Sequence, residues 1–278
     1  MQAYHRPRTL QDALGALAGG AARVAAGCTD LFPATGAREL TGPVVDITRV
    51  EELRGVTQGP DGWRFGAATT WADVIRADLP PAFDMLKEAA REVGSVQIQT
   101  AGTLAGNICN ASPAADGVPC LLALEAEVEI GSVAGTRRVP LAGFITGVRR
   151  TVLRPGEMVL ALHVPDAAAH GRSRFLKLGA RRYLVISIAM VAVRLLVEEG
   201  RVSQAAVAVG ACSAVARRLA RLEGALVGAR ADETVGRVEA GLVLQDLAPI
   251  DDIRADAAYR GTAAVELIRR AIGDLVRA

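Results

Sequence analysis

The 278-residue chain has little of what a metal site or a disulfide framework would need. It has 4 cysteines and 3 histidines, no two cysteines form a C-x-x-C pair, and no histidine lies at ligand spacing from them. This pattern argues against a zinc site or an iron–sulfur cluster within the chain, so we expect no metal. Scattered cysteines in such a protein are typically small buried residues, and we expect this of Cys120 and Cys212.

The chain also has little net charge, few aromatic side chains and no long apolar run. The 32 basic and 30 acidic residues nearly cancel, and aromatic residues make up 4% of the chain, which gives no reason to expect a nucleic-acid partner. The longest apolar run, residues 184–197, is interrupted by Ser187 and Arg194 and is too short to cross a bilayer. The N-terminus has no apolar signal core. We therefore expect a cytoplasmic protein with no membrane span.

What the chain does have is enough apolar sequence for two compact domains, since 51% of its residues are hydrophobic. Helical and strand-like stretches alternate through residues 1–168, which we divide into subdomains of about 1–55 and 56–168. Residues 166–171 are small and polar and are expected to form a linker. Residues 172–278 predict a smaller α+β domain: β-rich runs at 187–197 and 202–211, joined as a hairpin, then helices at 214–227, 232–243 and 262–276.

Two segments are built from residues with little or no side chain: 26–30 (AGCTD), directly after a predicted strand, and 102–107 (GTLAGN). Small residues let backbone N–H groups approach a ligand, and consecutive amides at a turn or helix start form an anion-binding concavity. Two such loops could hold a pyrophosphate. Either loop alone would be interpreted as a tight turn, because neither fits the phosphate-binding P-loop or the G-x-G-x-x-G fingerprint.

Residues 103–116 (TLAGNICNASPAAD) resemble the T-x-G-G-N-x-x-N-A-S-P-A-x-D signature of the flavoprotein subunits of molybdenum hydroxylases, the group of xanthine dehydrogenase and carbon monoxide dehydrogenase. Residues 26–31 (AGCTDL) are similar to the A-G-G-T-D-L loop of that family, and residues 66–70 (GAATT) to its G-A-x-T-T turn. Further similarities follow in the same order at residues 154–165 (R-P-G-E to Pro165), 175–177 (FLK) and 252–260 (DIRADAAYR). The resemblance therefore covers nearly the whole chain.

The resemblance implies an α+β fold: a two-subdomain FAD-binding domain of the vanillyl-alcohol oxidase type, then a smaller domain with an antiparallel sheet and helices. It implies an oxidoreductase subunit that binds FAD non-covalently and receives electrons from the [2Fe–2S] clusters of a small subunit. The electrons then pass to NAD or another acceptor. A large molybdopterin subunit would hydroxylate the substrate, and the assembly would be a dimer of heterotrimers. No catalytic acid–base set is evident in the chain itself, and a flavin carrier needs none.

The family motifs also give a set of expected FAD contacts. Asp116 matches a carboxylate beside the flavin nucleotide, although it could instead cap the following helix. Lys177 matches a lysine near the flavin ring, although it could equally be a solvated strand residue. Arg254, Tyr259 and Arg260 are expected to be structural or interfacial. The complete set of expected contacts is Ala26, Gly27, Cys28, Thr29, Asp30, Leu31, Thr103, Leu104, Ala105, Gly106, Asn107, Asp116, Val159 and Lys177.

Two departures from the motifs weaken this interpretation. Cys28 replaces the second glycine of the first loop, and Ala105 replaces the first glycine of T-x-G-G-N. Both changes keep the backbone amide, but a Cβ could crowd a phosphate and strains any position with positive φ. The alternative hypothesis is therefore a flavin-free structural subunit of such a complex. A self-contained flavin oxidase is disfavoured, because the last hundred residues carry no acid–base set.

Overall fold

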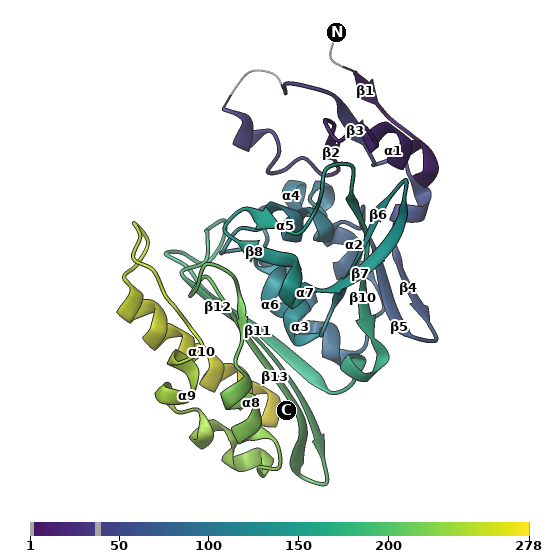
Figure 1. The fold of residues 1–278 in the computed structure, drawn as a ribbon. Coiled ribbons are helices and arrows are strands. Elements are labelled where there is room, and N and C mark those ends of the chain that lie inside the picture. The colour runs from purple at the N-terminus through teal and green to yellow at the C-terminus, as the bar shows by residue number, and fades with distance from the viewer. Residues whose placement is uncertain (1–2, 37–39, 278) are drawn as a thin grey trace.

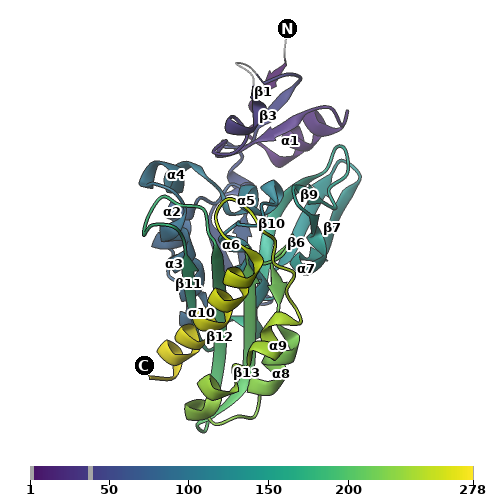
Figure 2. The ribbon, with the colours of Figure 1, turned by 90° about the vertical axis from the view of Figure 1, so that its left-hand side faces the viewer.

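The computed structural model describes residues 3–36 and 40–277 of the protein. Its first unit is a small parallel sheet in the order β1-β3-β2, with helix α1 beside it (Figure 1). Thr9 caps α1, because its hydroxyl accepts a hydrogen bond from the Asp12 amide. Val45, in the central strand, is fully buried. This sheet stands apart from the rest of the molecule at the N-terminal end (Figure 2).

The second unit is an antiparallel sheet of five strands in the order β4-β5-β10-β6-β7. Strand β10 is central and buried almost throughout, and helices α2, α3, α5 and α6 lie between this sheet and the C-terminal one (Figure 1). Helix α2 begins at a capping box in which Thr70 and Asp73 exchange hydrogen bonds between side chain and backbone.

The third unit is an antiparallel sheet in the order β11-β12-β13-β14, covered by α8, α9 and the long helix α10. The predicted hairpin is confirmed: β12 and β13 are joined at Glu199 and Gly200, both with positive φ (51° and 74°), as a two-residue turn that follows the strand twist requires. The α+β fold class predicted from the sequence is confirmed, with an antiparallel sheet and helices in the C-terminal part.

Alternate residues of strand β12 serve two different cores. Val191 and Val193 face the helices α8 to α10, whereas Met190 and Ala192 face the core shared with α6. The C-terminal sheet therefore lies between two helical layers, with α3 and α6 on one face and α10 on the other (Figure 2). Small residues on the α6 side, such as Ala192, allow that helix to pack close to the sheet.

Several predicted elements differ from the structure. Residues 166–171 do not form a free linker, because Asp166–Ala169 is a 3-10 turn (η4) with Ala168 and Ala169 buried. The predicted helix at 214–227 starts only at Ala220, since residues 217–218 pair with β13. The predicted helix at 232–243 is broken into η5 and α9, with an extended residue, Glu239, between them. Apolar periodicity alone did not reveal these tertiary interruptions.

The bounds of the strands are β1 Tyr4–His5, β2 Arg23–Ala25, β3 Val44–Asp46, β4 Val56–Gly59, β5 Gly62–Gly66, β6 Glu127–Ser132, β7 Gly135–Pro140, β8 Ile145–Gly147, β9 Arg150–Thr151, β10 Met158–Pro165, β11 Arg172–Leu178, β12 Ala189–Glu198, β13 Arg201–Gly210 and β14 Arg217–Arg218. The α-helices are α1 Leu10–Leu17, α2 Trp71–Arg76, α3 Asp84–Glu92, α4 Val96–Ala101, α5 Leu104–Asn110, α6 Gly117–Ala123, α7 Leu141–Phe144, α8 Ala220–Leu226, α9 Ala240–Leu244 and α10 Ala257–Arg277. The 3-10 turns are η1 Pro33–Thr35, η2 Glu51–Leu53, η3 Pro81–Phe83, η4 Asp166–Ala169 and η5 Ala231–Arg237.

Candidate functional site

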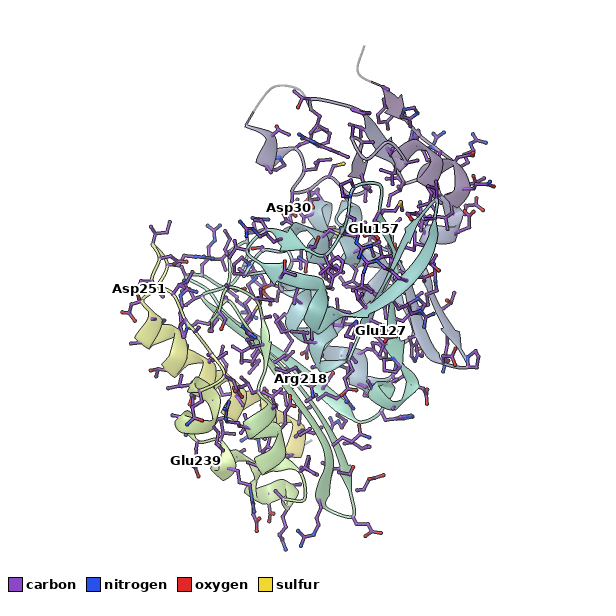
Figure 3. All side chains as sticks on the ribbon, in the orientation of Figure 1. Asp30, Glu127, Glu157, Arg218, Glu239 and Asp251 are labelled. Atoms are coloured by element: carbon purple, nitrogen blue, oxygen red, sulfur yellow. The ribbon has the colours of Figure 1, made fainter. Side chains whose placement is uncertain are left out.

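The two glycine-containing loops lie directly against each other. A Cβ built on Gly27 would stand 1.9 Å from the carbonyl oxygen of Ala101 and 2.7 Å from Cα of Gly102. A Cβ on Gly102 would in turn stand 3.2 Å from Oγ1 of Thr29. Only glycine at 27 permits this backbone approach. Asp30 lies at the junction between the N-terminal sheet and the rest of the molecule (Figure 3). The loops are therefore adjacent, as the two-loop hypothesis requires.

The first loop offers free backbone donors. None of the amides of residues 27–31 donates a hydrogen bond to any residue within 3–36 or 40–277. Cys28 has a φ of 57°, in the left-handed region, and its thiol donates to the Ala26 carbonyl at 3.5 Å. Burial raises the pKa of this thiol, so it is not an activated nucleophile. The expected strain at position 28 is thus present.

The second loop is the first turn of a helix. Thr103 caps α5 and its Oγ1 accepts from the Gly106 amide at 3.0 Å, while the Asn107 amide donates to the Thr103 carbonyl at 3.1 Å. These amides are occupied, contrary to the expectation that the whole loop offers donors. The amides left without a partner in the described chain are those of Thr103 and Ala105. The Ala105 side chain is buried in the core, so its Cβ does not face the neighbouring loop.

Asn107 has an unsatisfied side chain. Its Oδ1 is buried and accepts no hydrogen bond in the described structure, and it lies at the start of α6, where a Cβ on Gly117 would stand 3.1 Å away. A buried carbonyl oxygen without a donor costs free energy of about 1–3 kcal/mol. A hydroxyl-bearing ligand would supply the missing donor, whereas a phosphate oxygen, which only accepts, would not.

Asp116 and Lys177 are brought together by the fold. Lys177 Nζ donates to Asp116 Oδ2 at 2.7 Å, and Ser187 Oγ donates to Asp116 Oδ1 at 2.6 Å. The Lys177 and Asp116 side chains are only 7% and 8% exposed. Burial raises the pKa of the Asp116 carboxyl, while the Lys177 ammonium and the Ser187 hydroxyl oppose that rise. Because the pair is buried, removing one partner would strand the other charge.

This pair changes two expectations. The Asp116 side chain does not cap α6, although the residue stands at the N-cap position, because both carboxylate oxygens bind β11 and the segment before β12. Lys177 is not a solvated strand lysine, because its ammonium is buried against α6. Ser187, which completes the cluster, was not predicted. Its position ten residues after Lys177 gives no periodic signal, since the chain between them folds back as a loop.

Val159 is 4% exposed in the central strand β10 and packs into the main core. A bulge follows it, where the pairing with β6 shifts between Val159 and Ala161. On its other edge β10 pairs with β5, and there the Leu160 carbonyl accepts from the Ala67 amide at 2.9 Å. The strand therefore passes close to the 66–70 turn that the sequence motifs single out.

A cavity of about 530 Å³ opens beside the first loop. Cys28 lines it from the loop, and Tyr4 and Asp46 line it from β1 and β3. The Tyr4 hydroxyl donates to the Asp46 carboxylate, and Thr48 donates through both its amide (2.9 Å) and its hydroxyl (2.6 Å). Burial alone would raise the pKa of Asp46, but these hydrogen bonds outweigh burial and lower it. An ionised carboxylate is therefore built into this wall.

Two arginines missed by the sequence analysis hold the C-terminal end of α6. Arg194 Nε donates to the Ala123 carbonyl at 3.2 Å, and Arg218 Nη1 donates to the Leu122 carbonyl at 3.1 Å. Cations at a helix C-terminus satisfy its free carbonyls and its dipole. Arg218 lies where the C-terminal sheet meets the helices of the second unit (Figure 3). Helix α6 is thus bound to the C-terminal sheet at both ends.

Arg260 is structural, in line with its sequence-based interpretation. It is 1% exposed, and its Nη1 donates to the carbonyls of Ile188 (2.6 Å) and Ala211 (2.9 Å), while its Nη2 binds Asp252 at 2.6 Å. Cys120 and Cys212 are fully buried, as expected. Over the described ranges, no cluster of three histidine, cysteine or acidic residues could bind a metal, and no helix has the length and apolarity to span a membrane.

Two family models match the chain. Residues 1–167 match the "FAD binding domain in molybdopterin dehydrogenase", and residues 174–275 match the "CO dehydrogenase flavoprotein C-terminal domain". A putative xanthine dehydrogenase FAD-binding subunit of Escherichia coli is 31% identical over 99% of this chain and 96% of its own length. The carbon monoxide dehydrogenase medium chain of Hydrogenophaga pseudoflava is 28% identical, over 97% and 95% of the two chains.

Solved structures agree. A chain of carbon monoxide dehydrogenase from Hydrogenophaga pseudoflava superposes with a TM-score of 0.88 at 29% identity, covering 99% of this chain and 96% of that chain. A chain of reconstituted carbon monoxide dehydrogenase from Oligotropha carboxidovorans gives 0.91 at 26% identity, covering 100% and 98%. The chain thus belongs to the family of FAD-binding medium subunits of the molybdopterin hydroxylases, and it is an oxidoreductase subunit whose N-terminal part is an FAD-binding domain.

Proposed function

We propose that the FAD pyrophosphate is bound in the contact zone between residues 26–31 and 103–107. The observation that carries this proposal is the close approach of Gly27 to Ala101 and Gly102, beside which the amides of residues 27–31 have no partner in residues 3–36 and 40–277. Unpaired amides are strong donors to an oxyanion, and a phosphate needs several of them. In the second loop, the donors would be the amides of Thr103 and Ala105 rather than those of Gly106 and Asn107.

The remaining expected contacts fit other parts of the cofactor. The orphaned Oδ1 of Asn107 suits a hydroxyl of the ribityl chain, because a hydroxyl can donate to it. Lys177 would stand near the flavin ring, and Asp116 and Ser187 would position it rather than contact the ring themselves. Val159 would contribute its backbone. When bound, FAD supplies the redox chemistry, and a nearby ammonium favours the reduced, anionic ring.

The chain would act as the electron-transfer subunit of a multi-subunit molybdenum hydroxylase. Electrons would arrive from the [2Fe–2S] clusters of a small partner and leave to NAD or another acceptor, while a large molybdopterin subunit hydroxylates the substrate. The assembly would be a dimer of heterotrimers. Support comes from relatives that are named as medium chains or FAD-binding subunits and that align over nearly their full length.

A second candidate is a flavin-free structural subunit, and one observation favours it. Cys28 holds a left-handed φ of 57° that glycine would adopt without strain, so this loop bears a cost that the family motif avoids. The other departure gives no such support, because the Ala105 side chain is buried in the core on α5. Of the two departures from the family motifs, Cys28 alone therefore supports a flavin-free subunit.

The experiment that separates the two is reconstitution of the full chain with FAD, followed by gel filtration and an absorbance spectrum. We expect retained flavin bands and, by calorimetry, a dissociation constant in the micromolar range or tighter, about −8 kcal/mol or more favourable. A chain that folds, elutes as a compact species and binds no FAD at these concentrations would contradict the proposed function.

A further inference from the structure

The motif at residues 252–260 lies before and within the first turn of α10 and takes no part in the proposed FAD site. The helix does not need Asp252 as a cap. Two other aspartates, Asp251 and Asp256, accept hydrogen bonds from amides of its first turn, each at 2.6 Å. Asp252 is therefore available for a different role, and its partners are two arginines of the same motif.

Asp252 holds these two arginines against one short stretch of backbone. Its Oδ1 accepts from Nη2 of Arg260 at 2.6 Å, and its Oδ2 accepts from Nε of Arg254 at 3.1 Å. Hydrogen bonds from Arg254 hold the pKa of the Asp252 carboxyl well below its usual range, so the carboxyl is ionised. Arg254 Nη1 also donates to the Ser187 carbonyl at 3.4 Å. Arg260 Nη1 donates to the next carbonyl, that of Ile188, at 2.6 Å.

Ser187 is the point at which these arginines meet the proposed flavin site. The residue is fully buried, and its hydroxyl donates to Oδ1 of Asp116 at 2.6 Å, while Lys177 Nζ donates to Oδ2 at 2.7 Å. Each carboxylate oxygen thus has its own donor, so the position of Ser187 fixes the rotation of the carboxylate and the place of the ammonium. We call the series Asp252, Arg254, Ser187, Asp116 and Lys177 the Ser187 relay.

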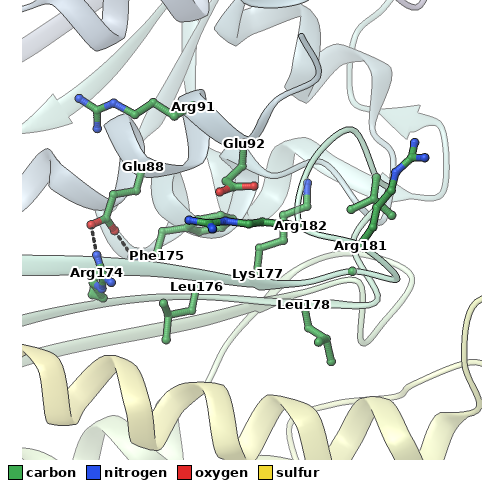
Figure 4. Close-up of a pocket in the computed structure, with 12 residues that line it drawn as sticks. Glu88, Arg91, Glu92, Arg174, Phe175, Leu176, Lys177, Leu178, Arg181 and Arg182 are labelled. Atoms are coloured by element: carbon green, nitrogen blue, oxygen red, sulfur yellow. Dashed lines mark hydrogen bonds and ion pairs between the residues drawn. The ribbon is translucent and has the colours of Figure 1, made fainter.

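Lys177 lies on the face of β11 that points away from α10. Leu176 and Leu178 point toward α10, and Lys177 points to the opposite side (Figure 4). Lys87 and Lys177 are the only lysines among the 32 basic residues of the sequence. A lysine ammonium is a point charge on a flexible stem, whereas the planar fork of arginine is preorganised. The place of this charge therefore depends on the bonds that its partners make.

We propose that Asp252 and Arg254 are positioning residues for Lys177. Acting through Ser187, they hold its ammonium at the proposed flavin-ring region. A positive charge there favours the reduced, anionic ring, so the Ser187 relay raises the reduction potential of the flavin. The inference rests on the proposed function, since it assigns the regulation of that same site.

The first test is acylation of lysines in the flavin-free full chain by an N-hydroxysuccinimide ester, with modified peptides quantified by mass spectrometry. The reagent reaches Lys177 Nζ only in molecules whose ion pair with Asp116 has opened. Loss of a hydrogen bond to a charged group shifts such an equilibrium about tenfold, so Ser187→Ala should raise the Lys177 rate about tenfold. Arg254→Ala should raise it about threefold, because its bond to Ser187 is long.

Three controls accompany this measurement. Lys87, half-buried on α3, is the internal reference, and its rate should not change. Arg270→Ala is the matched variant, because Arg270 is an exposed arginine that pairs with a nearby acid, Glu266, at 2.8 Å. It should leave the Lys177 rate unchanged. If Arg254 acts through Ser187, the double variant of these two residues should react no faster than Ser187→Ala alone, since effects within one network do not add.

The second test is the reduction potential of the FAD-loaded full chain, followed by absorbance against reference dyes. In Ser187→Ala, the displaced ammonium should shift the equilibrium about tenfold toward the oxidised ring, which is about 30 mV more negative for a two-electron couple. Arg254→Ala should shift the potential in the same direction by less, and Arg270→Ala should not shift it. A potential in Arg254→Ala that equals or exceeds the wild-type value would overturn the proposal.

The two tests separate this inference from the proposed function. A wild type that retains no FAD contradicts the proposed function, and the Lys177 rates of the flavin-free chain still decide whether the Ser187 relay holds the lysine. Equal Lys177 rates in the wild type and Arg254→Ala overturn the inference even where FAD is retained. Raised rates with an unchanged potential overturn the regulation of the flavin and leave the proposed function standing.

Discussion

The first and second loops resemble each other in the sequence and differ in the structure. Residues 27–31 form an irregular bend whose amides have no partner among the residues that the structure describes, and Cys28 there bears a left-handed backbone. Residues 104–107 begin helix α5, and the cap at Thr103 occupies the amides of Gly106 and Asn107. Although the two loops are similar in composition, the first has backbone amides available to bind an anion, whereas amides of the second are already bonded within the protein. The following predictions test that division of roles.

The largest effect is expected at Gly27. In Gly27→Ala, the new Cβ would meet the Ala101 carbonyl oxygen at 1.9 Å, so the two loops must move apart. We expect FAD affinity to fall roughly a hundredfold, or about 3 kcal/mol, as for overpacked sites. Calorimetry with FAD measures it. Gly19→Ala is the matched control, since a Cβ there has nothing within 4 Å. Equal losses of FAD affinity in both variants would show that the loss does not come from the contact between the two loops.

A smaller effect is expected at Thr103. Thr103→Ala removes the hydroxyl that accepts from the Gly106 amide, so α5 loses its cap and about 1 kcal/mol of stability. FAD affinity should fall less than about tenfold, because the first loop keeps its donors. Urea unfolding of this variant measures the loss of stability, and FAD titration of the same variant measures the loss of affinity. A loss of affinity as large as that of Gly27→Ala would show that the second loop is a principal donor.

Cys28→Gly and Ala105→Gly, which both restore the family glycines, should have opposite effects. At position 28, glycine relieves a left-handed φ that costs about 1–2 kcal/mol, less its own entropy of about 0.5–1 kcal/mol, a net gain near 0.5–1 kcal/mol. At position 105, glycine weakens a buried helical turn by about 0.5–1 kcal/mol. Chemical denaturation measures both. Changes of the same sign would show that the two positions are structurally alike.

The smallest effect concerns pH. The folded state lowers the pKa of Asp46, so this group contributes stability above its unfolded pKa of about 3.9, and the contribution is lost as pH falls through the folded value. We expect less than about 1 kcal/mol, because solvent screens the site partly. The difference between the unfolding midpoints at pH 5 and pH 3 should be smaller in Asp46→Asn than in the wild type, while the other carboxyls with lowered pKa values keep part of it. An unchanged acid dependence in that variant would show that the ionised Asp46 carboxylate does not contribute to stability.

Motifs in the sequence identified more of this site than residue patterns did. The β12–β13 hairpin follows from local chemistry, which was enough to predict it, and the cap at Thr9 and the capping box at Thr70 depend on local chemistry of the same kind. The pairing of Lys177 with Asp116 joins residues 61 positions apart and depends on how β11 packs on α6, which no local pattern shows. The same holds for Arg194 and Arg218, whose partners are backbone carbonyls of a distant helix.

The segment 100–116 shows the limit most clearly. Its small residues predicted loops with free amides, whereas residues 96–101 and 104–110 are two short helices. Thr103 carries the hydroxyl of an N-cap, and that signal could have identified the second helix. The first loop was predicted correctly as an irregular bend, because a strand followed by AGCTD has no helical periodicity. The assignment of individual FAD contacts stays a prediction until a bound structure is obtained.

Helix α6 is attached to the C-terminal sheet at both ends, through its N-cap residue Asp116 at one end and the carbonyls of Leu122 and Ala123 at the other. Because both ends of the helix are bonded to the sheet, α6 is held in one position on it. We therefore expect no hinge at residues 166–171 between the two domains. A movement between parts of the chain is expected instead where the small N-terminal sheet meets the body, next to the glycine contact at position 27.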